Sequence, residues 1–252
     1  MFFLLISSVM ADVLEIKVNQ SSISLPYLPA RTSHYGAVLI VKGGVDAQWP
    51  LLLTHFSEQL ATNGWSVVLL NSTNDNSIPW INQLPEAISV LRQNHNKRIV
   101  LVHYGEQLNQ SLEYFNKPQA KMINGLVLLS AYDDQSGLDK FDRLRFPLFD
   151  VAGQFDYDMV LSQMGQREKE FKRGNYQAIE MPGAHHDYAY SQKLLIAFIH
   201  GWMTKLPETQ IQRPPILVSY IEPIYSPSSL IAVVDESNWK GFIDDPVEPP
   251  EQ

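Results

Sequence analysis

Short runs of aliphatic residues recur along this chain, and each is separated from the next by a stretch with helical periodicity. Residues 37–41, 66–70 and 99–102 are such runs, and uninterrupted apolar runs of this length are typical of strands buried on both faces of a sheet. Between the first two, residues 51–61 place apolar side chains on one helical face, and Asn63-Gly64 ends the helix. Strands that alternate with helices predict an α/β fold with a mostly parallel sheet and helices on both faces.

The alternation continues along most of the chain. We expect further strands at 13–18, 126–129, 148–152 and 176–181, and further helices at 81–93, 107–115, 159–172 and 188–203. A chain of 252 residues, of which 45% are hydrophobic, is large enough to bury one sizeable core. The sequence therefore predicts one main domain, from residue 12 to residue 206.

The first eleven residues differ from the rest. Residues 2–9 form an apolar run that is too short to span a bilayer, and Val9-Met10-Ala11 has the small-x-small pattern of a signal-peptidase site. We therefore expect a signal peptide at 1–11 and a periplasmic or secreted protein; a buried first strand is the alternative. We expect no transmembrane segment, because no later stretch reaches membrane-spanning length.

The other end of the chain is rich in proline. Residues 207–252 contain eight prolines, and their last part is acidic. We expect a C-terminal extension here, with two short strands or an extended arm over 216–234 and a disordered end.

Composition excludes several kinds of partner and chemistry. The formal charge is −8, and 19 basic residues are scattered among 27 acidic ones, so we expect no nucleic-acid surface. The absence of cysteine excludes disulfides, thiolate nucleophiles and cysteine-ligated zinc. We expect no cofactor, and a small ligand or an envelope protein as the partner.

In open parallel sheets, ligands bind beyond the carboxyl ends of the strands, so the loops there hold the candidate residues. Gly43-Gly44 follows the run 37–41. Glycines let a backbone approach a ligand closely, and a loop of this kind can supply a backbone N–H to an oxyanion. A plain turn is the alternative.

The run 99–102 leads into His103-Tyr104-Gly105-Glu106-Gln107, where a strand is expected to turn sharply into a helix. In a G-x-S-x-G elbow the central residue carries the attacking hydroxyl. Here the central residue is Gly105, which has no side chain, so the nucleophile position is degenerate. His103, Tyr104 and Glu106 are candidate binding residues around it, and the alternative for each is a packing or surface role.

Two further loops offer an acid and a base. Asp156 follows an expected strand in the pattern Gly-x-x-Asp, and we prefer it to Asp158; a helix N-cap is the alternative. His185 and His186 follow the next strand, and adjacent side chains on an extended segment point in opposite directions. One of them is expected to face Asp156 and the other to contribute to binding. No metal site is expected, because these residues lack the spacing with which several ligands converge on one ion.

These motifs, in this order, resemble the α/β-hydrolase superfamily. A narrower resemblance, over residues 36–203, is to an uncharacterised family of exported bacterial α/β-hydrolase-like proteins, a domain of unknown function. The segments that carry it are Gly43-Gly44, Trp49-Pro50, Asn63-Gly64-Trp65, residues 149–153, Asp156, Tyr176-Gln177, Pro182-Gly183-Ala184, His186-Asp187 and His200-Gly201-Trp202. The resemblance implies that His186, rather than His185, is the hydrolase histidine and that Asp156 is its acid. Gly105 is the departure from the superfamily pattern.

Two functions are compatible with this departure. The first is a non-catalytic, hydrolase-like protein that binds a ligand or partner in the former active site or through its tail. The second is an esterase-type hydrolase with an unusual nucleophile, such as a water molecule activated by His186. Loss of the nucleophile from a triad removes several orders of magnitude of rate, which favours the first.

Overall fold

The computed structural model describes residues 12–44, 50–70, 78–135, 137–171 and 175–209. The signal peptide expected at 1–11 lies outside the described residues. So does all but the start of the extension expected at 207–252. The fold described below is that of the expected main domain.

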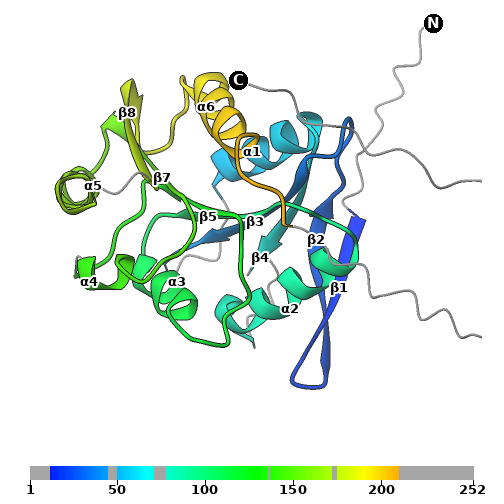
Figure 1. Ribbon diagram of the computed structural model, residues 1–252. Helices are drawn as coiled ribbons and strands as arrows, with labels where there is room; N and C mark the ends of the chain where they lie inside the picture. Colours follow the sequence, from blue (N-terminus) through cyan, green and yellow to red (C-terminus); the bar gives the residue numbers. More distant parts are fainter. Residues whose placement is uncertain (1–11, 45–49, 71–77, 136, 172–174, 210–252) are drawn as a thin grey trace, which may run out of the picture. The chain divides into compact units, whose positions relative to one another are not determined.

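Eight strands of the described residues form one sheet in the order β1-β2-β4-β3-β5-β6-β7-β8 (Figure 1). The strands are β1 (Asp12–Val18), β2 (Ser21–Leu28), β3 (Gly36–Lys42), β4 (Trp65–Leu70), β5 (Ile99–Tyr104), β6 (Gly125–Leu129), β7 (Leu148–Phe155) and β8 (Tyr176–His185). All neighbouring pairs from β4 to β8 are parallel. β2 runs antiparallel to both β1 and β4. The mostly parallel sheet predicted from the sequence is confirmed.

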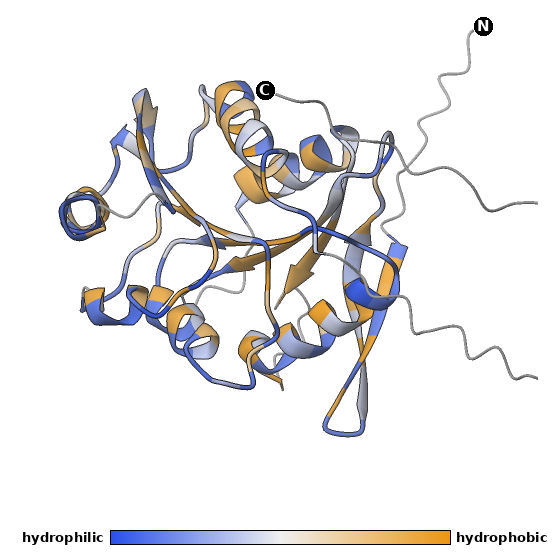
Figure 2. Cartoon of the chain, viewed as in Figure 1, coloured by the Kyte–Doolittle hydropathy of each residue, from blue (hydrophilic) through white to orange (hydrophobic). Residues whose placement is uncertain are grey.

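Helices cover both faces of this sheet, also as predicted. They are α1 (Leu51–Thr62), α2 (Trp80–Gln93), α3 (Leu108–Phe115), α4 (Leu138–Phe141), α5 (Asp158–Glu170) and α6 (Gln192–Met203). α1 and α6 share one core with the sheet, and α2 and α3 share the other (Figure 1). Hydropathy follows this layering, since the central strands are apolar and the polar residues lie on the outer sides of the helices (Figure 2). No helix of the described residues is long and apolar enough to cross a bilayer.

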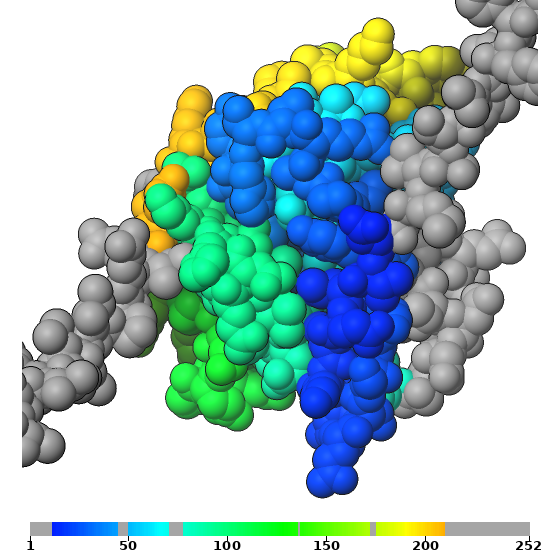
Figure 3. Space-filling view, turned by 90° about the vertical axis from the view of Figure 1, so that its right-hand side faces the viewer, coloured from blue at the N-terminus to red at the C-terminus, as the bar shows by residue number. Residues whose placement is uncertain are grey.

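The first hairpin closes one edge of the sheet. Leu14, Ile16 and Val18 of β1 are buried, whereas the residues between them are exposed, which is the alternation expected for an edge strand. Figure 3 looks onto this edge, where the β1–β2 hairpin lies beside α2. The sequence did not predict β2, because its serines and Pro26 are more typical of loops than of strands.

Most predicted boundaries differ from the observed ones by a few residues, and α6 shows the physical reason for one difference. The predicted helix starts at Tyr188, whereas α6 starts at Gln192. Tyr188 has a φ of +51°, a left-handed conformation that cannot continue into a right-handed helix. The chain therefore makes two tight turns, with Tyr188 N–H bonded to His185 O and Ser191 N–H bonded to Tyr188 O, before α6 begins.

Candidate functional site

The parallel strands bring three separated parts of the sequence to one edge of the sheet. Gly105 follows β5, Asp156 follows β7 and His186 follows β8, while β6 pairs with both β5 and β7. The Tyr104 ring, one residue before Gly105, lies 5.2 Å from the His186 ring. We call Gly105, Asp156 and His186, with the open space beside Gly105, the elbow site.

Gly105 has the sharp turn that an elbow requires. Its φ is +80°, which glycine adopts without the steric penalty of other residues. Gly105 N–H donates to Leu129 O at 3.2 Å, and Tyr132 N–H donates to Gly105 O at 3.0 Å. A Cβ atom added at this position would meet no heavy atom within 4 Å. The backbone of the turn is therefore held by β6 and the loop after it, and there is room for a side chain where the sequence has none.

His103 does not line this space, which corrects one expectation. Its side chain is fully buried. The Nε2–H donates to Glu106 O at 2.8 Å, and since that leaves Nδ1 as the acceptor, the Ser111 hydroxyl donates to Nδ1, also at 2.8 Å. Burial lowers the pKa of His103 from 6.5 to about 4. His103 is a neutral packing residue whose hydrogen bonds connect the elbow to α3. This agrees with the packing role given above as the alternative to binding.

Tyr104 and Glu106, on either side of Gly105, both reach the site. The Tyr104 side chain is 5% exposed, and its hydroxyl has no hydrogen-bond partner among the described residues. Burial and the charge of Asp156 raise the pKa of Tyr104, so that the phenol stays neutral. Glu106 is exposed and accepts a hydrogen bond from the Tyr132 hydroxyl at 2.8 Å.

Asp156 and His186 form the contact expected from the sequence. His186 Nδ1 lies 2.7 Å from Asp156 Oδ1, and the Asp156 carboxyl is fully buried. Burial alone would raise the pKa of Asp156, but hydrogen bonds from His186 and Ser130 lower it below its usual value of 3.8. Because the carboxylate is ionised, Nδ1 carries the proton, and Nε2 of a neutral His186 is a free acceptor.

Ser130, which is itself bonded to Tyr188, holds the other oxygen of this carboxylate. The Ser130 hydroxyl donates to Asp156 Oδ2, and the Tyr188 hydroxyl lies 2.7 Å from Ser130 Oγ. Since the single Ser130 proton is directed at the carboxylate, Tyr188 is the donor to Ser130. Both residues are fully buried and have positive φ angles, 46° and 51°, a conformation that costs energy for residues other than glycine.

The hydrogen bonds that Asp156 accepts from groups other than His186 were not predicted from the sequence. Ser130 directly follows β6, at the edge where ligands bind, and that position was the only available signal. Gly153 N–H also donates to Asp156 Oδ2, at 3.2 Å, and Tyr157 N–H donates to Oδ1, at 2.8 Å. The orientation of Asp156, and through it that of His186, is therefore fixed by both side chains and backbone.

The two adjacent histidines have different environments. The His186 ring is stacked on Tyr157, with 4.2 Å between the ring centroids, and also contacts Tyr104. His185 is exposed, and its ring lies 5.3 Å from that of Phe155. Of the two histidines, His186 contacts Asp156, as the resemblance implied, and His185 is exposed.

Gly43 and Gly44 pack directly against the elbow. Gly43 N–H donates to Tyr104 O at 2.9 Å, and a Cβ on Gly43 would lie only 1.6 Å from Glu106 O. Gly44 has a φ of +90°, and a Cβ there would lie 3.2 Å from Glu106 Oε2. Both glycines approach the elbow closely, Gly43 its backbone and Gly44 the Glu106 carboxylate. The approach to a ligand that the sequence predicts for them stays a prediction. The next residues, 45–49, lie outside the described part.

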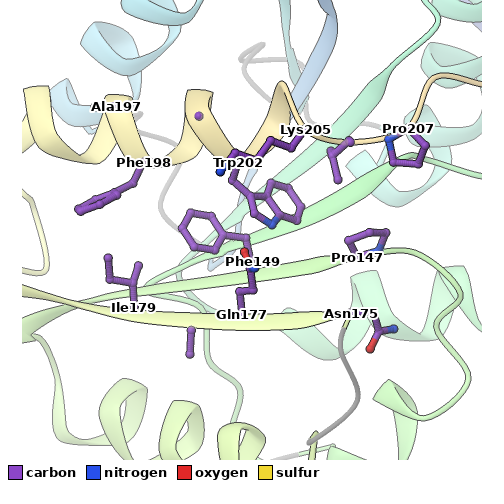
Figure 4. A pocket seen from close by; sticks show the side chains of 13 residues that line it. Pro147, Phe149, Asn175, Gln177, Ile179, Ala197, Phe198, Trp202, Lys205 and Pro207 are labelled. Atoms are coloured by element: carbon purple, nitrogen blue, oxygen red, sulfur yellow. The ribbon is translucent and has the colours of Figure 1, made fainter.

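The described residues contain no group of three or more His, Cys, Asp or Glu side chains arranged to hold a metal ion. A groove of about 630 Å³ lies between α6 and the first residues of β7 and β8, where Trp202 stacks on Phe149 (Figure 4). Because this groove is at the amino ends of the strands, it is separate from the elbow site.

Comparison with known proteins supports the fold. No family model and no curated protein matches the sequence. Solved structures do match. The esterase domain of a Rhodothermus marinus protein has a TM-score of 0.59 and 13% identity over 78% of this chain and 99% of its own. A dienelactone hydrolase from Anabaena variabilis has a TM-score of 0.62 and 11% identity, over 78% and 98%.

A third match is to a serine hydrolase without a lid from Xanthomonas campestris, with a TM-score of 0.58 and 15% identity over 80% of this chain and 97% of its own. These structures and the observed strand order show that the chain has the α/β-hydrolase fold. Identities this low carry no information on activity, because one fold serves many functions.

Proposed function

We propose that this α/β-hydrolase-fold protein binds a ligand at the elbow site and does not perform acyl transfer through an elbow nucleophile. The observation that carries the proposal is Gly105. It occupies the nucleophile position with an intact turn and with free space instead of a hydroxyl. No described serine or threonine is hydrogen-bonded to His186, and the chain has no cysteine.

The charge beside the elbow also supports this proposal. A hydrolase stabilises the oxyanion of its tetrahedral intermediate with N–H groups of the elbow and of the facing loop. Here the Glu106 carboxylate lies next to Gly44, in the loop that would supply one of those groups. A negative charge at this place opposes a developing oxyanion, because like charges at short range repel strongly outside bulk water.

A second candidate function is hydrolysis by a water molecule that His186 activates. One observation favours it: His186 Nε2 has no hydrogen-bond partner among the described residues, while Nδ1 is held by Asp156 at 2.7 Å. A histidine in this state is a suitable general base. We rank this candidate second because general-base catalysis contributes about 10²–10⁴-fold, less than a complete triad.

Hydrolysis of p-nitrophenyl acetate separates the two candidates. We expect the wild-type protein, His186→Gln and the control His185→Gln to have the same rate, equal to that of an unrelated protein at the same concentration. Water activation predicts instead that His186→Gln lowers the rate at least about tenfold, while His185→Gln leaves it unchanged. That result would replace the binding proposal with the hydrolytic one.

We further propose that the protein is exported and belongs to the exported hydrolase-like family that it resembles. The support is the apolar run at 2–9 followed by Val9-Met10-Ala11. Mass spectrometry of protein from its native host should give Asp12 as the first residue, in material from outside the cytoplasm. An intact Met1 on cytoplasmic protein would contradict this.

A further inference from the structure

Three acidic residues lie in or next to the elbow site. The Glu106 carboxylate is beside Gly44, and Asp156 is bonded to His186. Asp187 follows directly in the chain, and its charge, together with that of Asp156, acts on the Tyr104 hydroxyl. A ligand at this site is therefore exposed to a negative field, which favours positively charged groups and disfavours carboxylates and phosphates.

Aromatic rings line the same place. Tyr104 and Tyr157 lie on the His186 ring, and Tyr132 contacts Tyr157 edge to face, with 6.4 Å between ring centroids. Tyr157 is 55% exposed although its ring is stacked on His186, so part of this aromatic surface is accessible to a ligand. The electron-rich face of a tyrosine attracts organic cations.

The Tyr104 hydroxyl adds a polar group to this place. It has no hydrogen-bond partner among the described residues, and the charges of Asp156 and Asp187 act on it. A phenol hydroxyl here can bind a polar atom of a ligand.

From this geometry we infer that the ligand of the elbow site carries an organic ammonium group, held over the tyrosine rings and paired with Glu106. The inference rests on the proposed binding function and names its ligand class. A free small molecule and a lipid headgroup can both present such a group. The carboxylate and rings supply the attraction, and Tyr104 is placed to donate a hydrogen bond to a neighbouring oxygen of the ligand.

Choline and its uncharged isostere 3,3-dimethylbutan-1-ol test the inference, because they have nearly the same shape and differ in charge. Titration by calorimetry, with NMR detection of the tyrosine and histidine rings, should show saturable binding of choline. The isostere should bind about tenfold more weakly or not at all, and acetate should not bind. Equal binding of the two alcohols, or stronger binding of acetate, would overturn the inference.

Two pairs of variants locate the binding. Tyr157→Leu keeps apolar bulk but removes the aromatic face, and should weaken choline binding at least about threefold. Tyr190→Leu is its control, since Tyr190 is fully exposed. Glu106→Gln removes one charge and should also weaken binding, whereas Glu168→Gln, on the exposed side of α5, should not. Equal effects in either pair would contradict the assignment to this site.

Vesicles separate the two sources of the cation. If the ligand is a lipid headgroup, the protein should co-float with phosphatidylcholine vesicles more than with phosphatidylglycerol vesicles, and Tyr157→Leu should abolish the difference. Binding of neither choline nor phosphatidylcholine would refute the inference. The proposed function fails by a different result, His186-dependent ester hydrolysis, so the two failures are distinguishable.

Discussion

The two halves of the elbow site differ in what they contain. On the side of β7 and β8, Asp156 and His186 form a carboxylate–histidine pair, with four donors on one carboxylate. On the side of β5, the turn at Gly105 has a positive φ and no side chain. The comparison shows that the elbow conformation does not depend on a nucleophile. It is held by hydrogen bonds from β6 and by the buried His103.

The largest expected effect compares two glycines of the elbow half. Gly43→Ala would force a Cβ to within 1.6 Å of Glu106 O, so we expect it to lower the free energy of unfolding by about 3 kcal/mol or more. Gly105→Ala meets no neighbouring atom and should lose only about 1 kcal/mol, for its left-handed φ. Urea unfolding measures both. Equal losses would mean that the two loops are not packed as described.

The second prediction concerns the pH dependence of stability, which tests whether the buried His103 is neutral in the folded protein. In the unfolded chain a histidine takes up a proton near pH 6.5, whereas folded His103 does so only near pH 4. As the pH falls from 6.5 to 4, the unfolded state therefore gains protons first, and stability drops by about 3 kcal/mol.

Denaturant unfolding at a series of pH values checks this. His103→Asn should be less stable at neutral pH but should lose much of the slope between pH 6.5 and 4, while the exposed control His185→Asn keeps it. Asp156 acts in a lower window: because its pKa is lowered in the folded protein, its contribution is lost only as the pH falls below about 3.8. An unchanged slope in His103→Asn would show that another group causes the acid sensitivity.

A smaller loss of stability is expected when a hydrogen bond to Asp156, in the other half of the elbow site, is removed. Ser130→Ala removes a donor to Asp156 and leaves the Tyr188 hydroxyl with Val151 O, at 3.2 Å, as its remaining partner, at a cost of about 1 kcal/mol. The pKa of Asp156 should rise, which carboxyl NMR detects directly. The exposed Ser162→Ala is the matched control. A Ser130→Ala variant with unaltered stability and Asp156 pKa would remove Ser130 from the account.

Much of the fold was predictable from local pattern. Residues 99–102 are apolar on both sides of the chain because β5 is covered on both faces, and that pattern exists in the sequence itself. β2 was missed because its pairing with β1 and β4 overrides weak local preferences. The four-residue helix α4 was also missed, since so short an element has almost no periodicity to detect.

The residues of the site could be predicted where they directly follow a strand and belong to a known motif. Asp156 and His186 follow strands and match a known motif, so their contact was expected. The contact with Ser130 was not, because Ser130 is 26 residues from Asp156 in the sequence and 58 residues from Tyr188, its other partner. The burial of His103 and the position of Glu106 beside Gly44 could not be predicted either. Both depend on how two loops pack against each other, and the sequence of one loop alone does not determine that.

The measurement that most directly tests the central claim is labelling with a fluorophosphonate probe, followed by mass spectrometry of the labelled peptide. The wild-type protein should not be labelled above a heat-denatured sample, because position 105 has no hydroxyl. Gly105→Ser should become labelled slowly at residue 105, and the further change His186→Gln should abolish that labelling. Labelling of the wild-type protein at any serine or threonine, at the rate of Gly105→Ser or faster, would contradict the account.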